Sequence, residues 1–220
     1  MEMVSLGDGD RCVDFSSTGH GLDWYRHLKD DGIVAVILDG ASPGVQGDVE
    51  RALAAGLRVM LFQGYYPPDW HTLDAAALRA RELVDLARAL GFPAADNGPT
   101  LWLDLEDTGS VSANDMFGWC SLWGRIVRDA GFSAGIYVGA GQPLGSDELW
   151  NIVPVSHYWR SASQVPDVAV RGYQLVQERV NQMTYGVWVD YDRVERDRLG
   201  GLPIAVGDRL PFGHSPRQRP

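Results

Sequence analysis

The sequence is poor in cysteine and in positive charge, and each shortage excludes a class of protein. Its 220 residues hold two cysteines, Cys12 and Cys120, which are too few for a disulfide framework and lack metal-ligand spacing. We expect both to be buried. Lys and Arg number 19 against 29 Asp and Glu, a formal net charge of -10, and no basic run is present. Nucleic acid is therefore excluded as an expected partner, because its phosphates need a positive surface.

Long apolar runs are also absent. No segment approaches the length needed to span a bilayer, and the negative charge disfavours an anionic lipid surface, so we expect no membrane partner. The first residues, MEMVSLGDGDRC, lack a basic region followed by an apolar stretch. This predicts no secretory signal peptide.

Short β-rich runs alternate with helical patterns, which is typical of parallel βα units. Eight such runs are present: RCVDFSS, VAVILDG, RVMLFQG, TLWLDLE, SAGIYVGA, HYWRSAS, RGYQLVQ and GVWVDYD. They predict an α/β fold, a compact single-domain (β/α)8 TIM-type barrel over residues 11–204. An open doubly wound sheet is the alternative. Residues 1–10 are predicted to be a lead-in, and residues 205–220 a tail that contributes little to the core.

Four segments have helical spacing of apolar residues. The clearest are residues 73–90 and the segment from Asn114 to Gly131, both expected to cover the sheet. Two shorter helices are predicted in DWYRHLKDDG and GDVERALAAG, each ending at a glycine. The later connections leave room for little helix.

Carboxylates gather where the predicted strands end, on the face of a barrel where the following loops meet. They are Asp14, Asp39, Asp104, Glu106, Asp190 and Asp192. Asp104 and Glu106 are two residues apart, so on a strand they share a face. Ionising both of two carboxyl groups this close together costs free energy, because their negative charges repel. One of them is therefore expected to keep its proton and act as a general acid. The alternative, that acidic residues here only cap helices, is the interpretation we favour for Asp39.

These residues resemble a known family. LWLDLEDTG, CVDFSS, GIYVGAG, YQLVQ and GVWVDYDRV, spread over residues 11 to about 196, look like glycoside hydrolase family 25 lysozymes and the related glycoside-hydrolase-like barrel domain of actinobacteria and their phages. The closing VDYD is more similar to the latter domain. The resemblance implies cleavage of the β-1,4 bond after N-acetylmuramic acid in peptidoglycan. It also implies Glu106 as general acid, Asp104 as its partner, and Asp14 and Asp190 as the rest of an acidic floor.

Aromatic rings and amides would supply the rest of a sugar site, because Trp and Tyr rings stack on pyranose faces. We select Tyr65, Tyr137 and Trp188 for stacking, with core packing as the alternative for each. Gln63 and Gln174, each near a strand end, are predicted to hydrogen-bond acetamido groups. Asp192 is assigned to substrate binding.

Three other motifs fail on physical grounds. GASPG matches the nucleophile elbow G-x-S-x-G, but Pro43 follows Ser42 and has no N–H for an oxyanion. VGAGQPLG is one residue longer than the dinucleotide fingerprint. The five histidines include no pair at i, i+4. We therefore expect no cofactor and no metal.

Two functions remain. The first is a hydrolase of the bacterial cell wall, a phage lysin or a tail-borne enzyme acting on peptidoglycan or a related glycan. The second is a non-catalytic barrel that binds glycan, or that serves as a structural part of a virion or cell envelope with a protein partner there. Outside the cell wall, the predicted lack of a signal peptide would leave the chain cytoplasmic. Release of soluble products from purified peptidoglycan distinguishes the two functions.

Overall fold

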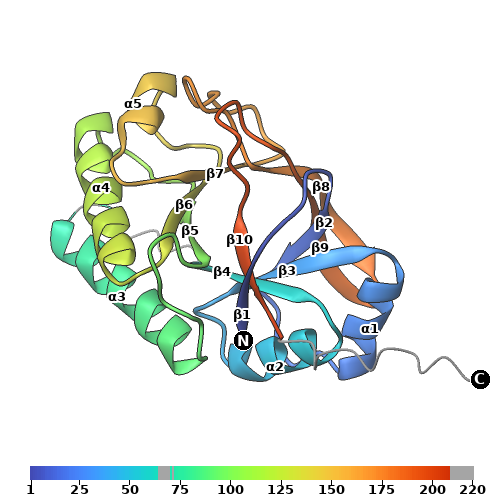
Figure 1. Ribbon diagram of the computed structural model, residues 1–220. Coiled ribbons are helices and arrows are strands. Elements are labelled where there is room, and N and C mark those ends of the chain that lie inside the picture. Colours follow the sequence, from blue (N-terminus) through green and yellow to red (C-terminus); the bar gives the residue numbers. More distant parts are fainter. Residues whose placement is uncertain (64–69, 71, 209–220) are drawn as a thin grey trace, which may run out of the picture.

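Eight strands close into a barrel in the computed structural model, which describes residues 1–63, 70 and 72–208 (Figure 1). All eight predicted runs form strands. In chain order they are β2 (Arg11–Phe15), β3 (Ile33–Asp39), β4 (Arg58–Gln63), β5 (Thr100–Leu105), β6 (Ser133–Val138), β7 (His157–Arg160), β8 (Leu175–Thr184) and β9 (Val187–Val194). Each pairs with the next, and β9 pairs with β2 to complete the closure.

The predicted all-parallel (β/α)8 arrangement is wrong at β9. Strands β2 to β8 are parallel, whereas β9 runs antiparallel to both of its neighbours. Only Tyr185 and Gly186 separate β8 from β9, and both have positive φ, 49° and 82°. Positive φ at both central residues is typical of the tight turns of β-hairpins, and a parallel crossover needs a dozen residues or more. The short connection therefore requires β9 to run antiparallel to β8.

Five helices lie among the described residues, fewer than the eight of a regular barrel. They are α1 (Leu22–Asp30), α2 (Val45–Ala54), α3 (Leu73–Ala89), α4 (Ala113–Asp129) and α5 (Ser146–Asn151). Figure 1 shows α3 and α4 side by side on one flank and α1 and α2 on the other. Thr72 and Ser112 begin the two long helices, each hydroxyl accepting a hydrogen bond from an N–H three residues later at 3.2 Å. The four helices predicted from spacing are all present.

A second set of large side chains fills the barrel interior, separate from the core between strands and helices. Trp102 is fully buried there, and its indole N–H donates to Met60 Sδ at 3.4 Å. Its ring meets Trp159 edge-on at 5.8 Å, and Trp159 meets Tyr137 at 4.6 Å. A Cβ at Gly135 would lie 2.4 Å from the Trp102 ring, so glycine there makes room for the indole. This aromatic column supports the carboxyl end of the barrel from below.

Both ends of the described chain are part of the sheet, so residues 1–10 are more than a lead-in and the predicted tail begins too early at residue 205. The rest of that predicted tail, residues 209–220, lies outside the described residues. β1 (Glu2–Ser5) pairs antiparallel with β10 (Ile204–Gly207), and β10 pairs with β4 through Val206 and Val59. Ala205 and Val206 are fully buried. Leu6 and Ala205 pack into the barrel interior. Residues 205–207 therefore belong to the folded unit, because their small apolar side chains close the barrel at its amino-terminal end.

A buried carboxylate joins the loop after β2 to α2. Asp48 is fully buried and accepts hydrogen bonds from the N–H of Gly19 at 2.7 Å and the hydroxyl of Tyr25 at 2.7 Å. Arg51 pairs with it at 3.1 Å. Burial alone would raise the pKa of Asp48, but these partners hold it below its usual value. Asp48 was not among the residues selected from the sequence.

No helix of the described part of the chain is both long and apolar enough to cross a lipid bilayer.

Candidate active site

A cavity of about 470 Å³, the acidic cleft, opens at the carboxyl ends of the parallel strands. Its volume is in the range of small-molecule sites. Five of its lining residues carry carboxyl groups, Asp14, Asp39, Asp104, Glu106 and Asp190, and the others include Phe62, Tyr137, Trp159, Gln177, Asn181 and Trp188. The cleft therefore combines carboxyl groups, aromatic rings and amides.

The structure brings together the four carboxylates that the sequence selected as catalytic. Asp14 lies on β2, Asp104 on β5 and Glu106 directly after it. Asp190 does not end a strand as predicted, because β9 runs in the opposite direction. It reaches the cleft because the register of β2 and β9 places it opposite Asp14.

Asp104 is the more deeply buried member of the Asp104 and Glu106 pair. Burial first, and then the charges of Glu106 and Asp14, raise the pKa of Asp104 well above its usual value. Its Oδ1 is buried and has no hydrogen-bond partner among the described residues. A buried, unpartnered carboxyl oxygen favours the neutral acid. The surroundings of Asp104 therefore favour its protonated form.

Glu106 is less enclosed. Burial raises its pKa, and the charges of Asp107 and Asp190 raise it further. The charges that raise the pKa of Glu106 are thus those of Asp190, which the sequence analysis selected, and Asp107, which it did not. A carboxyl that keeps its proton closer to neutral pH, in an open cavity, fits the requirements of a general acid.

Asp14 and Asp192 form a pair at the base of the cleft. Asp192 is 2% exposed and accepts a hydrogen bond from Trp159 Nε1 at 2.8 Å. Burial and the charge of Asp14 raise the pKa of Asp192 well above its usual value, so the two carboxyls do not readily ionise together. Burial and then the charge of Asp190 raise the pKa of Asp14 to about 7. Asp192 lies beneath the cleft rather than lining it, so its predicted contact with substrate is corrected to a contact with Asp14.

Gln177 connects the carboxylates, and the sequence analysis missed it. Its Nε2 donates to Asp190 Oδ2 at 2.9 Å and to Asp14 Oδ2 at 3.4 Å. Its Oε1 accepts from Tyr137 Oη at 3.2 Å and from the N–H of Ala162 at 3.2 Å. Because a backbone N–H can only donate, the amide has one orientation, with its donors toward the carboxylates. Strand periodicity could have found Gln177, since it shares the inner face with Leu175.

Gly139 gives Glu106 its space. A Cβ at this glycine would lie 2.3 Å from Glu106 Cβ and 2.8 Å from Glu106 Oε2. The loop is held in place by a hydrogen bond from Gly139 N to the carbonyl of Leu105 at 2.9 Å. Any larger residue would displace the carboxyl. The sequence analysis included this glycine in the GIYVGAG motif but did not predict its contact with Glu106.

Two of the three selected aromatic residues lie at the cleft. Tyr137 stands on the inner face of β6, against Trp159 and Gln177. Trp188 lies near the start of β9, lines the cavity and is 60% exposed. Tyr65 lies outside the described residues. Trp159, 2% exposed, was not selected from the sequence but forms part of the floor.

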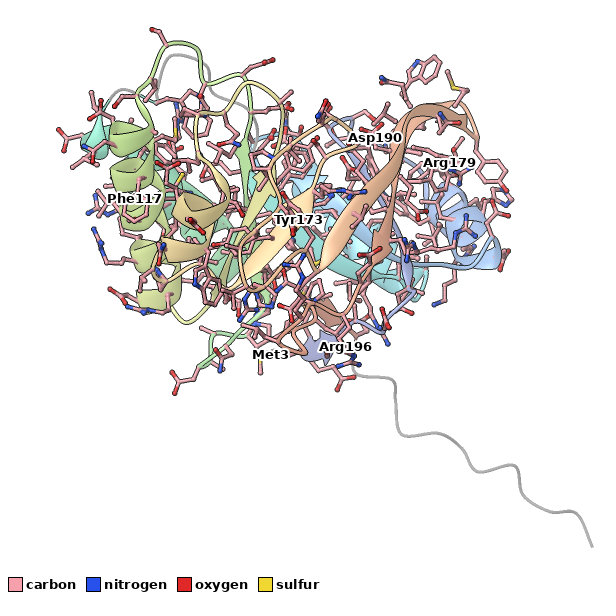
Figure 2. All side chains as sticks on the ribbon, turned by 90° about the horizontal axis from the view of Figure 1, so that it is seen from above. Met3, Phe117, Tyr173, Arg179, Asp190 and Arg196 are labelled. Atoms are coloured by element: carbon pink, nitrogen blue, oxygen red, sulfur yellow. The ribbon has the colours of Figure 1, made fainter. Side chains whose placement is uncertain are left out.

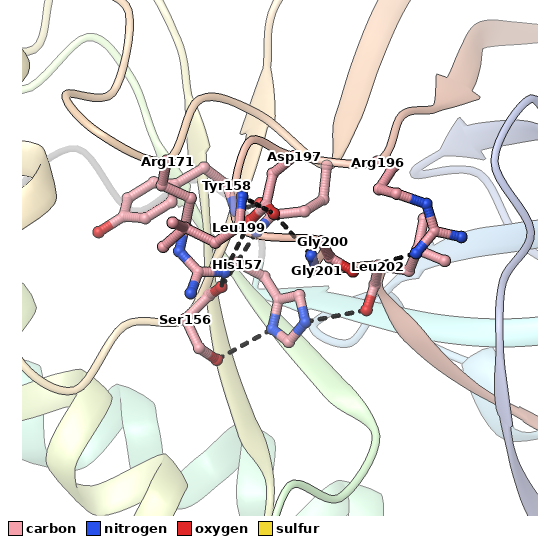
Figure 3. Close-up of polar contacts among 11 residues, drawn as sticks. Ser156, His157, Tyr158, Arg171, Arg196, Asp197, Leu199, Gly200, Gly201 and Leu202 are labelled. Carbon is pink, nitrogen blue, oxygen red and sulfur yellow. Dashed lines mark hydrogen bonds and ion pairs between the residues drawn. The ribbon is translucent and has the colours of Figure 1, made fainter.

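Gln63 and Gln174 are not in the cleft, which corrects the prediction that they meet acetamido groups. Gln63 is buried toward the helices, where its Oε1 accepts from Trp123 Nε1 at 2.5 Å. Gln174 precedes β8 and donates to Asp197 Oδ2 at 2.5 Å. Figure 3 shows the network around Asp197, whose carboxylate also pairs with Arg171 at 2.7 Å. This network joins the loops at the amino-terminal ends of β7 and β8, so its role is structural.

His157 belongs to the same structural network. Its ring nitrogens lie 3.0 Å from Ser156 Oγ and 3.1 Å from the carbonyl of Leu202, and burial lowers its pKa to about 4. A neutral imidazole is therefore expected at physiological pH, donating to the Leu202 carbonyl and accepting from Ser156 (Figure 3).

Asp39 lines the cleft but is bound to its own turn. Its Oδ1 accepts from the N–H of Ala41 at 2.8 Å, and its Oδ2 accepts from the Ser42 hydroxyl at 2.9 Å. Asp39 therefore holds a turn and does not cap α2 as expected, because the N-cap of that helix is Gly44 and no side chain caps it. Ser42 is a turn residue, as predicted. Among the described residues, no group of three or more His, Cys, Asp or Glu is arranged to hold a metal ion. Both cysteines are buried, as predicted.

A solved structure shares the fold of this chain. An uncharacterized B. stearothermophilus protein superimposes with a TM-score of 0.67 at 16% identity, covering 88% of this chain and 100% of that one. The spore cortex lytic enzyme SleM of Clostridium perfringens gives a TM-score of 0.47 at 12% identity, covering 75% of this chain and 61% of that one. No curated protein matches the sequence.

A family model matches most of the chain. The Rv2525c-like, glycoside hydrolase-like domain aligns with residues 41–198, which include Asp104, Glu106, Gln177 and Asp190. This match confirms the broader part of the resemblance seen in the sequence, a glycoside-hydrolase-like domain. The chain therefore belongs to the Rv2525c-like family of glycoside hydrolase-like domains.

Proposed function

We propose that this protein is a glycoside hydrolase that acts on peptidoglycan at the bacterial cell wall, as a muramidase similar to the family 25 lysozymes. The observation that carries the proposal is the acidic cleft itself. Asp104 and Glu106 both have raised pKa values beside Asp14 and Asp190, in a cavity with an aromatic floor. Glycosidases need one carboxyl that donates a proton and negative charge that stabilises an oxocarbenium-like transition state.

The burial and charges of the cleft support separate roles for the carboxyls. Glu106 is the general acid, because it is the less enclosed member of the pair and its pKa is raised. Asp104 keeps its proton and donates a hydrogen bond to the substrate. Asp190 supplies negative charge: burial raises its pKa, but the N–H of Asn181 donates to its Oδ1 at 2.6 Å and stabilises the carboxylate. Burial favours the neutral forms of Asp14 and Asp192 behind it. Gln177 holds Asp14 and Asp190 in place.

Stacking defines the rest of the site. Tyr137 presents its ring inside the cavity and Trp188 at its exposed rim, and aromatic rings of this kind stack on the faces of pyranose rings. We extend this role to Tyr65 from the sequence alone.

The variant Glu106→Gln tests the proposal. Gln keeps the shape of Glu but cannot deliver a proton, so release of soluble muropeptides with new reducing ends should fall about 100-fold to 10,000-fold. Binding to the same peptidoglycan should persist. Glu50→Gln on α2 is the matched control, an exposed glutamate bound to Gln46, and should leave both measurements unchanged.

Two results would contradict the proposal. An unimpaired Glu106→Gln protein refutes the acid assignment. A wild-type protein that binds peptidoglycan and never cleaves it supports the alternative, a non-catalytic glycan-binding or structural barrel.

A further inference from the structure

An exposed apolar pair stands beside the acidic cleft, near the tip of the β8–β9 hairpin. Met183 and Trp188 are cross-strand neighbours and are 54% and 60% exposed. Cross-strand neighbours project from the same face of a hairpin, so the two side chains form one surface. Figure 2 shows the hairpin, which carries Arg179 and Asp190, reaching outward at one edge of the barrel. Large apolar side chains exposed together indicate a binding surface.

The hairpin tip is fixed in position from its other side. The Tyr185 hydroxyl donates to Asp31 Oδ2 at 2.8 Å, and its ring stacks on His27 at 4.9 Å. Trp24 on α1 donates from its indole to the carbonyl of Thr184 at 3.2 Å. The tip is therefore anchored on α1 and on Asp31, which directly follows this helix. A surface that is already ordered loses less entropy on binding a ligand.

Trp188 makes this surface continuous with the cleft, because it also lines the cavity. A cavity of about 470 Å³ holds a few sugar units at most, so a longer glycan has to leave over the rim. At this rim the glycan meets two uncharged groups, the indole of Trp188 and the thioether of Met183. The apolar face of a pyranose ring suits such a surface, whereas the net charge of -10 disfavours an acidic partner.

We propose that Met183 and Trp188 form a platform for a sugar ring of the glycan chain outside the cavity, so that the protein prefers polymers to short oligosaccharides. This inference rests on the proposed function, since it takes the occupant of the cleft to be a glycan. It assigns the hairpin a role in selecting chain length, separate from bond cleavage.

Binding of a length series tests the platform. The full chain carrying Glu106→Gln, which does not turn over substrate, is titrated with di-, tetra- and hexasaccharides of β-1,4-linked N-acetylglucosamine by calorimetry. Adding Trp188→Ala should weaken hexasaccharide binding about tenfold, the loss expected for one stacked ring, and leave the disaccharide within about twofold. Met183→Ala should cause a smaller loss with the same length dependence.

Leu199→Ala is the matched control, since Leu199 is 53% exposed on the loop after β9, and it should change no affinity. Thermal melts should show that Trp188→Ala folds as the parent does, because an exposed side chain contributes little to the core.

Three outcomes would overturn the platform. Trp188→Ala could weaken the binding of short and long oligosaccharides equally, or the protein could bind none of them. Sedimentation could also show that the wild-type protein is a dimer and that Trp188→Ala is a monomer. The last outcome would assign the surface to a second copy of this chain. Peptidoglycan cleavage is measured separately on the wild-type protein. If binding depends on chain length but no cleavage occurs, the proposed hydrolase activity is rejected and the platform is retained. If cleavage occurs but binding does not depend on chain length, the platform is rejected and the hydrolase activity is retained.

Discussion

Replacing Asp14 by Asn should stabilise the fold at alkaline pH. Asp14 is partly exposed at the base of the cleft, and burial together with the charge of Asp190 raises its pKa from 3.8 to about 7. The unfolded chain loses this proton near pH 4, whereas the folded chain keeps it until about pH 7. Between these values the folded state binds more protons, so its stability falls as pH rises. Above pH 7 the loss is complete.

The size of the effect follows from the same pKa. Each pH unit between the two pKa values costs about 1.4 kcal/mol, so the wild-type protein loses up to about 3 kcal/mol between pH 5 and pH 7 through this group. Because Asp14 is partly exposed to solvent, which screens its charge, we expect about 1–3 kcal/mol. Asn has no titratable proton. The stability difference between Asp14→Asn and the wild type should therefore grow by this amount from pH 5 to pH 8.5, in favour of the variant.

Urea unfolding at pH 5 and pH 8.5 measures this difference. Comparing the two pH values cancels any steric effect of Asn, which is the same at both. Asp23→Asn is the control, a side chain 85% exposed on α1, and its stability difference should not change with pH. A change for Asp14→Asn within about 0.5 kcal/mol of zero, or of the opposite sign, would refute the raised pKa of Asp14.

Three further substitutions test particular contacts. Gly139→Ala should displace Glu106 and lower peptidoglycan cleavage about 10-fold to 100-fold. The control Gly21→Ala, where the added Cβ meets open space, should leave cleavage unchanged. Equal cleavage rates for the two variants would show that the position of Glu106 is not critical. Asp48→Ala should lower the free energy of unfolding at pH 7 by about 2–4 kcal/mol in urea melts, and a cost below 1 kcal/mol would contradict its anchoring role. Val206→Ala should cost about 2 kcal/mol, because β10 is part of the core; an unchanged melting curve would restore the view of this segment as a tail.

The sequence was sufficient to predict the elements that local patterns encode. Runs of β-branched and aromatic residues predicted eight strands, and apolar spacing predicted four helices, because both patterns come from neighbours in the chain. The periodicity of two also placed Asp104 and Glu106 on one face. The strand ends then indicated a shared acidic site with Asp14, and this is where the structure places all three.

Other features depend on contacts between distant segments. The reversal of β9 brings Asp190 opposite Asp14, although neither strand alone specifies that register. The sequence alone favoured Gln174, yet the inner face of β8 begins at Leu175 and so selects Gln177. The terminal strand β10 is stable only because β1 and β4 pair with it.

The chemistry of the cleft is also a tertiary property. A pair of carboxylates on one strand indicates that a proton is retained, but burial decides which group keeps it, and here burial raises the pKa of Asp104 well above its usual value. Likewise, Asp192 carries the same side chain as Asp190 but lies below the cleft, against Trp159 and Asp14. The sequence therefore determined which residues could form the site, because residue type and strand phase are local. The closed barrel decided which of them meet and which hold protons, because desolvation and charge proximity exist only after folding.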